Sequence, residues 1–153
     1  LSKPEEVKQL SEEAKRLNIN VLINNAAIVC PNITLDQYEN DLIDRMINVN
    51  LRAPIILTKN LLDNLERVVN INSMVGLEIK TPRTLYSATK WGLRGFSNSL
   101  KKESDMIVLD VYATNIKTDP SRINAMDIHM VVDSIYDAFV KEKEELILDG
   151  RKQ

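Results

Sequence analysis

Short apolar segments of strand length alternate with longer segments of helical period along the chain, and this alternation restricts the fold more than any other feature. The first apolar segment, residues 21–23, reads Val-Leu-Ile and has no polar side to turn toward solvent. Strands that are apolar on both sides are typical of a parallel sheet covered by helices on both faces. The alternation therefore predicts an α/β fold with a parallel sheet. We expect its strands at residues 21–23, 67–72, 106–112 and 145–148.

The segments between these strands carry the signals of helices. A first helix is expected to begin after Ser2, which would cap it together with Glu5. Residues 35–65 follow one long helical pattern that Pro54 interrupts, so we expect two consecutive or kinked helices with a break near residues 50–54. Two further helices are expected at residues 85–103 and 128–139, the second strongly amphipathic.

Composition excludes several classes of protein and of site. The 153 residues have the size of one domain, and 20 basic against 22 acidic residues give a net charge of −2, which argues against a nucleic-acid binder. No apolar run approaches the roughly 18 residues of a transmembrane helix. The single cysteine, Cys30, and the single histidine, His129, exclude an internal disulfide and a metal site built from several of either residue. We therefore expect no metal, no nucleic acid and no membrane among the partners.

A tyrosine and a lysine four residues apart are the first candidates for chemistry. Tyr86 and Lys90 lie in the helix expected at residues 85–103, where this spacing places both on one face. An ammonium group beside a phenol favours the phenolate and lowers the tyrosine pKa, so the tyrosine can exchange a proton with an alcohol or carbonyl near neutral pH. Taken alone, such a pair is more often a solvated helix face.

Polar residues also follow the predicted strands, at the sheet edge where open α/β proteins bind ligands. Ser73 comes directly after the strand at residues 67–72, and Asn24 and Asn25 follow the strand at residues 21–23. Because a buried asparagine is unfavourable unless it is hydrogen-bonded, two in succession suggest backbone contacts near a ligand. Taken singly, Ser73 is better explained as a turn serine, and the asparagines fit an Asn-rich turn equally well.

The combination of these features is far more specific than its parts. Asn-Asn-Ala-Ala follows the first strand, and the chain then carries Asn-Val-Asn-Leu-Arg-Ala-Pro at 48–54, Val-Asn-Ile-Asn-Ser at 69–73 and Tyr-Ser-Ala-Thr-Lys at 86–90. In this order and at these spacings the chain resembles the short-chain dehydrogenase/reductase family from Leu1 to about Thr118, and more loosely to its end. The resemblance implies a Rossmann-like, doubly wound parallel sheet in a single, partial NAD(P)-binding domain over residues 1–153.

The resemblance also implies roles for individual residues. Tyr86 corresponds to the catalytic acid/base, and Lys90 to the residue that lowers the tyrosine pKa and holds the ribose hydroxyls of the nicotinamide. Ser73 corresponds to the group that orients the substrate oxygen and stabilises its developing charge. Asn50 matches the family's proton-relay asparagine, which would sit at the helix kink and hold a water connected to Lys90.

On the cofactor side, Asn25 matches an asparagine of the family's Asn-Asn-Ala-Gly motif, and Ala26 follows it. Thr118, together with the backbone of Ile116, matches the loop that contacts the nicotinamide carboxamide. The resemblance implies NAD or NADP as the cofactor. The expected cofactor contacts are Asn25, Ala26, Tyr86, Lys90, Ile116 and Thr118.

The chain departs from the family pattern at its start and after its third strand. The family's first strand, Gly-rich turn and helix receive the cofactor pyrophosphate and have no counterpart here, so we expect roughly 60 residues to precede Leu1. Ala113-Thr114 replaces the Pro-Gly that shapes the loop facing the cofactor. The strand at residues 21–23 would border the absent strand, and its apolar edge would invite pairing with another chain.

The leading hypothesis is an NAD(P)-dependent oxidoreductase that moves a hydride between the nicotinamide and a small-molecule carbonyl or alcohol, with Tyr86 handling the proton. The alternative is a non-catalytic binding or scaffold protein of the same fold, or an inactive truncated relic. The enzyme is favoured because the family's four catalytic residues are all present, as Asn50, Ser73, Tyr86 and Lys90.

The resemblance extends to assembly and location. Family members commonly pair through the two long helices that match residues 35–65 and 85–103. Gly92, Gly95 and Ser99 would allow a close approach of helices at such an interface. We therefore expect a cytoplasmic homodimer or homotetramer.

Overall fold

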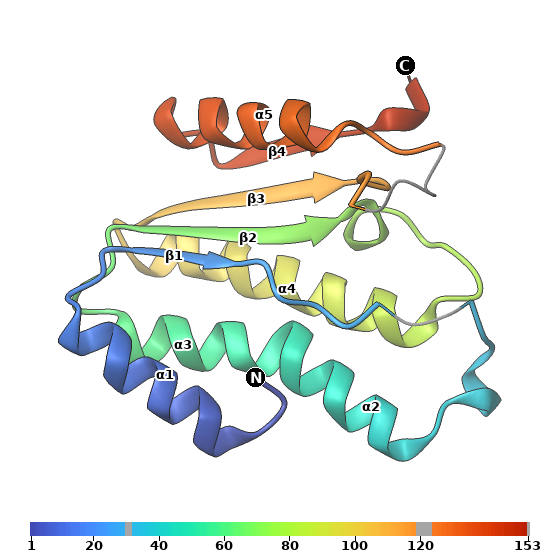
Figure 1. Ribbon diagram of the computed structural model, residues 1–153, viewed down its shortest axis with the longest axis horizontal. Coiled ribbons are helices and arrows are strands. Elements are labelled where there is room, and N and C mark those ends of the chain that lie inside the picture. The colour runs from blue at the N-terminus through green and yellow to red at the C-terminus, as the bar shows by residue number, and fades with distance from the viewer. Residues whose placement is uncertain (30–31, 119–123, 153) are drawn as a thin grey trace.

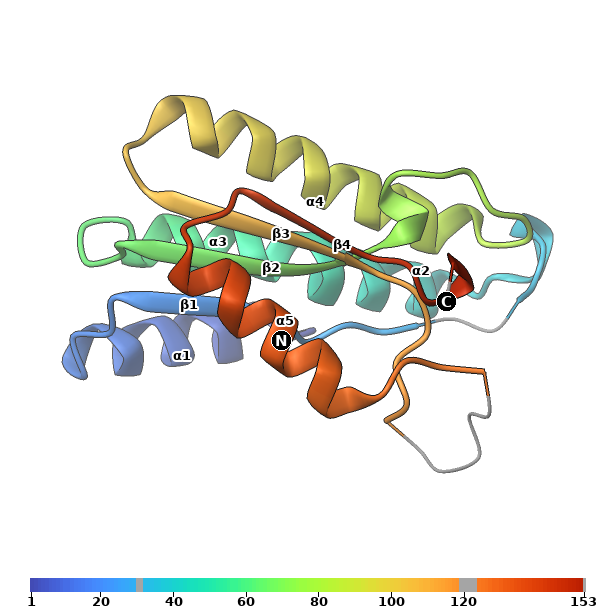
Figure 2. The same ribbon diagram turned by 90° about the horizontal axis from the view of Figure 1, so that it is seen from above.

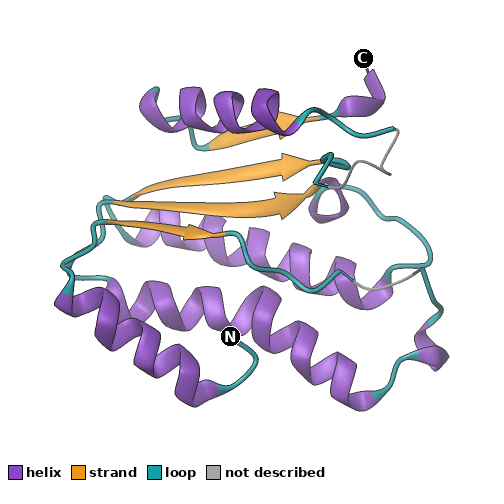
Figure 3. Cartoon of the chain, viewed as in Figure 1, coloured by secondary structure: helices purple, strands orange, loops and turns teal. Residues whose placement is uncertain are grey.

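The computed structural model describes residues 1–29, 32–118 and 124–152, and within them four strands form one parallel sheet. The strands lie side by side in chain order (Figures 1 and 3). Each predicted strand is confirmed, with its ends shifted by at most one residue, and so is the parallel α/β sheet. The strands are β1 (Val21–Asn24), β2 (Arg67–Ser73), β3 (Ile107–Ala113) and β4 (Glu145–Leu148).

Helices cover both faces of this sheet, as expected for a doubly wound fold. On one side lie α1 (Pro4–Arg16), α3 (Ala53–Leu61) and α4 (Thr84–Glu103), with α2 (Asn40–Ile47) continuing from α3 away from α1 (Figure 1). On the other side lies α5 (Ile128–Val140), which crosses in front of the strands when the molecule is seen from above (Figure 2).

Neighbouring residues of β2 and β3 face opposite sides of the sheet and fill two separate cores. Val68 and Val108 pack toward α1, α3 and α4, while Val69 and Leu109 pack toward α5. This is why neither side of these strands faces solvent. Ile23 of β1 lies beside Val69 in register but is 58% exposed, so the cover that α5 provides ends before β1. β1 is an edge strand of the described sheet.

The start of α1 differs from the prediction. Lys3, not Ser2, precedes the first helical residue, and no side chain caps the helix. Pro4 occupies the first turn, where its missing N–H removes a donor that would otherwise need a partner. Glu5 and Glu6 lie in the same turn, where their negative charges favour the positive end of the helix dipole. Proline and two carboxylates therefore take the place of the expected capping box.

The predicted break in the long helical pattern is a widened turn rather than a gap. A π-helical turn at Asn48–Arg52 joins α2 to α3, and in it the Ala53 N–H donates to the Asn48 carbonyl, five residues back. Pro54 then lies in the first turn of α3, where the absence of its N–H does no harm. Asn50 is buried within the widened turn. Short 3₁₀ turns at Leu35–Gln37, Met74–Gly76 and Gly150–Lys152 complete the described elements.

Five polar side chains cross the interior from β1 to the far end of α4, and we call them the polar chain. Asn24 Nδ2 donates to Asn70 Oδ1 at 2.8 Å, and Asn70 Nδ2 donates to Ser97 Oγ at 2.8 Å. Ser97 Oγ donates to Asp110 Oδ1 at 2.7 Å. Lys101 Nζ is the last member and donates to Asp110 Oδ2 at 3.0 Å. Burial raises the pKa of the Asp110 carboxyl, while Ser97 and Lys101 lower it. The polar chain fixes three strands and one helix relative to one another.

Candidate active site

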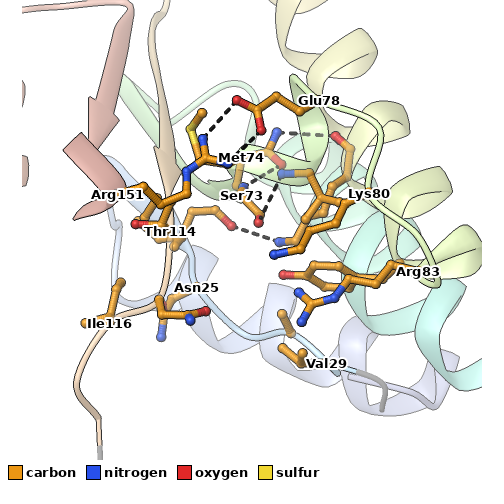
Figure 4. A pocket seen from close by; sticks show the side chains of 18 residues that line it. Asn25, Val29, Ser73, Met74, Glu78, Lys80, Arg83, Thr114, Ile116 and Arg151 are labelled. Carbon is orange, nitrogen blue, oxygen red and sulfur yellow. Dashed lines mark hydrogen bonds and ion pairs between the residues drawn. The ribbon is translucent and has the colours of Figure 1, made fainter. Parts of the chain in front are cut away.

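A cavity of about 250 Å³ opens at the carboxyl ends of the strands (Figure 4). Asn25 lines it from the segment after β1, and Ser73 lines it from the last position of β2. Tyr86 and Lys90 come from the first turns of α4, and Ile116 comes from the loop after β3. This edge of the sheet is where open α/β proteins bind ligands. Five of the predicted site residues, far apart in the sequence, thus share one cavity.

Lys90 is buried against the sheet without a carboxylate partner. Lys90 is only 2% exposed, and its Nζ donates to the Ile71 carbonyl at 2.9 Å. None of the carboxylates in the described ranges forms an ion pair with it. The same ammonium lies 5.7 Å from the centroid of the Tyr86 ring. Burial lowers the pKa of Lys90 to about 8, which means that this charge is poorly solvated and responds strongly to a negative charge nearby.

Ser73 is the last residue of β2 and lines the cavity. Its Oγ accepts from the Val75 N–H at 3.3 Å, and no acceptor among the described residues takes its hydroxyl hydrogen. Asn72 fixes both sides of the site, because its Oδ1 accepts from the Ser73 N–H at 2.9 Å and its Nδ2 donates to the Lys90 carbonyl at 3.3 Å. The role of Asn72 was missed in the sequence, where it occupied an ordinary strand position.

Asn50 lies behind the cavity and does not line it. Its Oδ1 accepts from the Ile28 N–H at 2.7 Å, and its Nδ2 donates to the Ile28 carbonyl at 2.9 Å. Nδ2 also contacts Thr89 Oγ1 at 3.3 Å, one residue before Lys90. Asn50 therefore joins the segment after β1 to α4, and its relay role stays a prediction.

The predicted cofactor residues divide into two groups. Asn25 and Ile116 line the cavity, whereas Ala26, between two lining residues, and Thr118, two residues after Ile116, do not line it themselves. Ile116 forms an isolated parallel bridge with Met126, and the Thr118 N–H donates to the Ile116 carbonyl at 2.9 Å. The backbone of this loop is therefore fixed where it meets the cavity.

Ala113-Thr114, in place of the family's Pro-Gly, connects the end of β3 to the C-terminal segment. Thr114 Oγ1 accepts from the Gly150 N–H at 2.9 Å and lies 3.4 Å from the Leu148 carbonyl. A Cβ added at Gly150 would come within 2.6 Å of Met126 Cγ, so only glycine lets the segment pass this closely. The threonine hydroxyl thus makes contacts that neither proline nor glycine could supply.

Four charged residues of the cavity lining were missed by sequence reasoning. Arg151 donates from both Nη atoms to Glu78 at 2.9 Å and from Nε to Asp149 at 2.7 Å, which joins the C-terminal segment to the loop after β2. Lys80 and Arg83 line the cavity from the same loop. Three charged residues lie close together between Ser73 and Tyr86, and this grouping could have indicated a site. We expected that segment to be only a connecting loop.

Cys30 lies outside the described residues, and within them no three His, Cys, Asp or Glu side chains are grouped as metal ligands. Across residues 1–29, 32–118 and 124–152, no helix has both the length and the apolarity needed to cross a membrane.

Comparison with known proteins by sequence matches this chain to one family of dehydrogenases. Residues 1–123 match the family model described as short chain dehydrogenase. Nodulation protein G from Rhizobium sp. (strain N33) is 36% identical over 110 residues, which cover 67% of this chain and 44% of that protein. The 3-oxoacyl-(acyl-carrier-protein) reductase of Aquifex aeolicus is 32% identical over 134 residues, which cover 81% of this chain and 54% of that protein. The chain thus spans about half the length of these curated relatives.

Solved structures share the fold at low sequence identity. An alcohol dehydrogenase from Comamonas testosteroni, specific for bulky-bulky ketones, has a TM-score of 0.87 at 24% identity, covering 96% of this chain and 62% of that one. A short-chain dehydrogenase from Sphingobium yanoikuyae, in complex with NADPH, has a TM-score of 0.84 at 22% identity, covering 96% and 64%. A 4-hydroxyisoleucine dehydrogenase complexed with NADH has a TM-score of 0.82 at 23% identity, covering 98% and 77%. From the family match over residues 1–123, this chain belongs to the short-chain dehydrogenase family.

Proposed function

We propose that the complete translated protein is an NAD- or NADP-dependent oxidoreductase that interconverts a small-molecule carbonyl compound and an alcohol, with Tyr86 as the acid/base. The observation that carries this proposal is the buried ammonium of Lys90, 5.7 Å from the centroid of the Tyr86 ring, at a cavity that Ser73 also lines. Buried charges without a carboxylate partner are unfavourable and occur mainly where chemistry uses them.

The geometry supports one division of labour. In the reductive direction Tyr86 donates its phenolic proton to the carbonyl oxygen, and the Lys90 charge favours the phenolate that results. Ser73 donates a hydrogen bond to the same oxygen while it gains negative charge. In the oxidative direction the phenolate takes the proton back from the alcohol. When bound, the nicotinamide supplies or accepts the hydride at the reacting carbon.

The residues on the other side of the cavity suit the nicotinamide end of the cofactor. Asn25 offers an exposed amide at the end of β1, and Ile116 offers backbone groups held by the bridge to Met126. We assign these two residues, with Ala26 and Thr118 beside them, to the carboxamide and ribose, and Lys90 to the ribose hydroxyls. Solved relatives of the fold hold NADPH or NADH, which supports the choice of cofactor.

We also propose that the protein forms a homodimer or homotetramer through α2, α3 and α4. Trp91, Gly95 and Ser99 form an exposed stripe on α4 at intervals of four residues, and a Cβ added at Gly95 would meet nothing within 4 Å. Gly92 does not belong to this stripe, because its added Cβ would lie 2.9 Å from Leu51 Cδ2 of the same chain. Light scattering should show an oligomer that Gly95→Glu dissociates, and a wild-type monomer at micromolar concentration would contradict the proposal.

The catalytic assignment is tested by Tyr86→Phe in the complete protein, assayed with NADH and NADPH on a broad panel of carbonyl compounds. We expect kcat to fall about a hundred- to ten-thousand-fold, because the general acid is lost while the ring stays packed. Tyr136→Phe, at an exposed position on α5, is the matched control and should leave kcat unchanged. An undiminished rate in Tyr86→Phe would refute the assignment, and a wild-type protein that turns over no carbonyl would favour the non-catalytic alternative.

A further inference from the structure

We propose that Lys80 and Arg83 bind an anionic group, a carboxylate or a phosphate, that the substrate carries close to its reacting carbon–oxygen bond. This inference rests on the proposed function and names the class of substrate. Both side chains line the cavity that Tyr86 and Ser73 also line. In Figure 4 they reach the cavity from the same side, across from Thr114 and Arg151.

The charges around the cavity are strongly unbalanced toward positive. The lining contains four cationic side chains and one carboxylate, which are Lys80, Arg83, Lys90, Arg151 and Glu78. The carboxylate is already used, because Glu78 receives two hydrogen bonds from Arg151 at 2.9 Å each. No ion pair joins Lys80 or Arg83 to any carboxylate of the described residues. Their positive charges therefore act on whatever molecule enters the cavity.

Arg83 is oriented for this task by a distant neighbour. Its Nε donates to Asn32 Oδ1 at 2.8 Å, a residue 51 positions earlier in the sequence. The bond orients the half-buried guanidinium, and no acceptor in the described part of the chain takes the N–H groups of its two Nη atoms. Two parallel N–H groups of this kind bind a carboxylate or a phosphate in a bidentate manner. Arg83 also precedes the first residue of α4 and thus stands three residues from Tyr86.

Lys80 contributes a positive charge but no fixed hydrogen-bonding geometry. Its side chain is exposed and long, so it contributes a mobile ammonium to the same part of the lining. A carboxylate held by the fixed guanidinium would gain further attraction from this second cation. The pair combines one group that orients the anion with one group that draws it in from solution.

The position of the pair assigns the anion to the substrate rather than to the cofactor. The residues proposed to hold the nicotinamide, Asn25 and Ile116, lie on the far side of the view in Figure 4 from Lys80 and Arg83. A molecule that places its oxygen on Tyr86 and Ser73 lies between these two groups of residues. Its end beyond the reacting carbon then faces the cations.

The test compares oxo acids with their methyl esters, which share the reacting carbonyl but lack the charge. Pyruvate, acetoacetate and levulinate vary the distance between carbonyl and carboxylate, and dihydroxyacetone phosphate against dihydroxyacetone tests a phosphate. The complete protein is assayed as wild type and with Lys80→Gln, Arg83→Gln and both changes. The control is Lys102→Gln, an exposed lysine about 28 Å further along α4 by helical rise, which removes the same charge away from the cavity.

We expect the double variant to raise KM for at least one anionic compound about ten- to a hundredfold, as the loss of hydrogen bonds to a charged group predicts. KM for the matching ester or for dihydroxyacetone should change less than about twofold, and kcat should change little. Equal effects on acid and ester, or an increase confined to KM of the cofactor, would overturn the proposal. A preference for the phosphate over all carboxylates would identify phosphate as the anion.

Isothermal titration calorimetry with the same compounds separates this inference from the proposed function. Tyr86→Phe should abolish turnover but retain binding of the preferred anion, and the double variant should lose that binding. If the wild type turns over nothing, then anion binding that disappears in the double variant but not in Lys102→Gln still supports the site, although the proposed function fails. Anion binding that is equal in all variants would overturn it.

Discussion

The two ends of α4 each carry a lysine, and the two lysines differ in whether a carboxylate pairs with them. Near the N-terminal end, Lys90 is 2% exposed and donates only to a backbone carbonyl, that of Ile71. Near the C-terminal end, Lys101 pairs with the buried carboxylate of Asp110 at 3.0 Å and donates to the Glu144 carbonyl at 2.9 Å. One helix thus carries an unpaired buried charge at the cavity and a paired one where it closes the polar chain.

The difference separates a charge that stabilises the fold from a charge to which we assign a role in the proposed chemistry. A pair such as Lys101 and Asp110 neutralises itself, and removing one partner leaves the other buried and unsatisfied. Lys90 has its charge directed at no carboxylate of the described chain, so the fold gains little from it. The contrast predicts that activity and stability respond separately at the two ends of the helix.

The largest effect is expected from Lys90→Met. Turnover should fall at least about a hundredfold, because the charge that favours the Tyr86 phenolate is lost. The free energy of unfolding at pH 7 should rise by about 1–3 kcal/mol, because a poorly solvated ammonium is replaced by an apolar chain of similar size. Chemical denaturation and steady-state kinetics of the complete protein measure both. A variant that loses stability together with activity would break the contrast.

Asp110→Ala should act in the opposite sense, on stability alone. We expect it to lower the free energy of unfolding by about 3 kcal/mol, because it breaks a buried ion pair and removes the carboxylate that accepts from Ser97 and Lys101. Asp137→Ala removes one partner of an exposed pair with Lys141 on α5 and should change stability by less than about 0.5 kcal/mol. If both substitutions have the same small effect, then the polar chain does not stabilise the fold as its geometry indicates.

The dependence of stability on pH isolates the Lys90 charge. The folded pKa of Lys90 is about 8 against 10.5 for an unperturbed lysine, so between these values the unfolded chain binds more protons than the folded one. The free energy of unfolding should therefore rise with pH, by about 2 kcal/mol between pH 8 and pH 10. Above pH 10 the buried Tyr112, whose pKa is raised by burial, acts in the opposite direction. Lys90→Met should abolish the rise, and a rise that persists in this variant would assign it to another group.

The smallest effects on stability are expected from replacing two glycines of α4. Gly92→Ala should destabilise the protein by about 1 kcal/mol, because its Cβ would press on Leu51 Cδ2 from 2.9 Å. In the dissociated protomer Gly95→Ala should be neutral or stabilising by up to about 1 kcal/mol, because no atom of the same chain lies within 4 Å of the added Cβ and alanine favours a helix. Thermal unfolding of the two variants compares the faces of α4 directly, and equal shifts would show that the difference in packing has no consequence.

Local pattern was sufficient for the sheet, whereas the candidate site came from the family resemblance. The apolar segments predicted every strand, since burial on both faces leaves no other pattern for a covered parallel sheet. The order and spacing of Ser73, Tyr86 and Lys90 predicted residues that share one cavity. The expectation of a helix break near Pro54 was close, because a missing N–H must be accommodated wherever it occurs.

What pattern could not supply depends on contacts between distant segments. Asp110 lies in the middle of an apolar strand, and only the folded chain brings Ser97 and Lys101 to it. Gly92 was expected at an interface between helices of two copies, whereas the structure places Leu51 against it. Arg83 lay in an expected loop, and its orientation depends on Asn32 from another segment. Each of these cases is decided by tertiary neighbours and not by local sequence.

The polar chain also restricts how this sequence can change over generations. Its links are directional, so each member supplies the donor or acceptor that the next one requires. A lineage that replaces Asn70 by an apolar residue leaves Asn24 Nδ2 without this acceptor and Ser97 Oγ without this donor, and restoring the balance requires further replacements in the same region. The set should therefore be inherited whole or exchanged whole, and close descendants of this chain that carry only part of it should be rare.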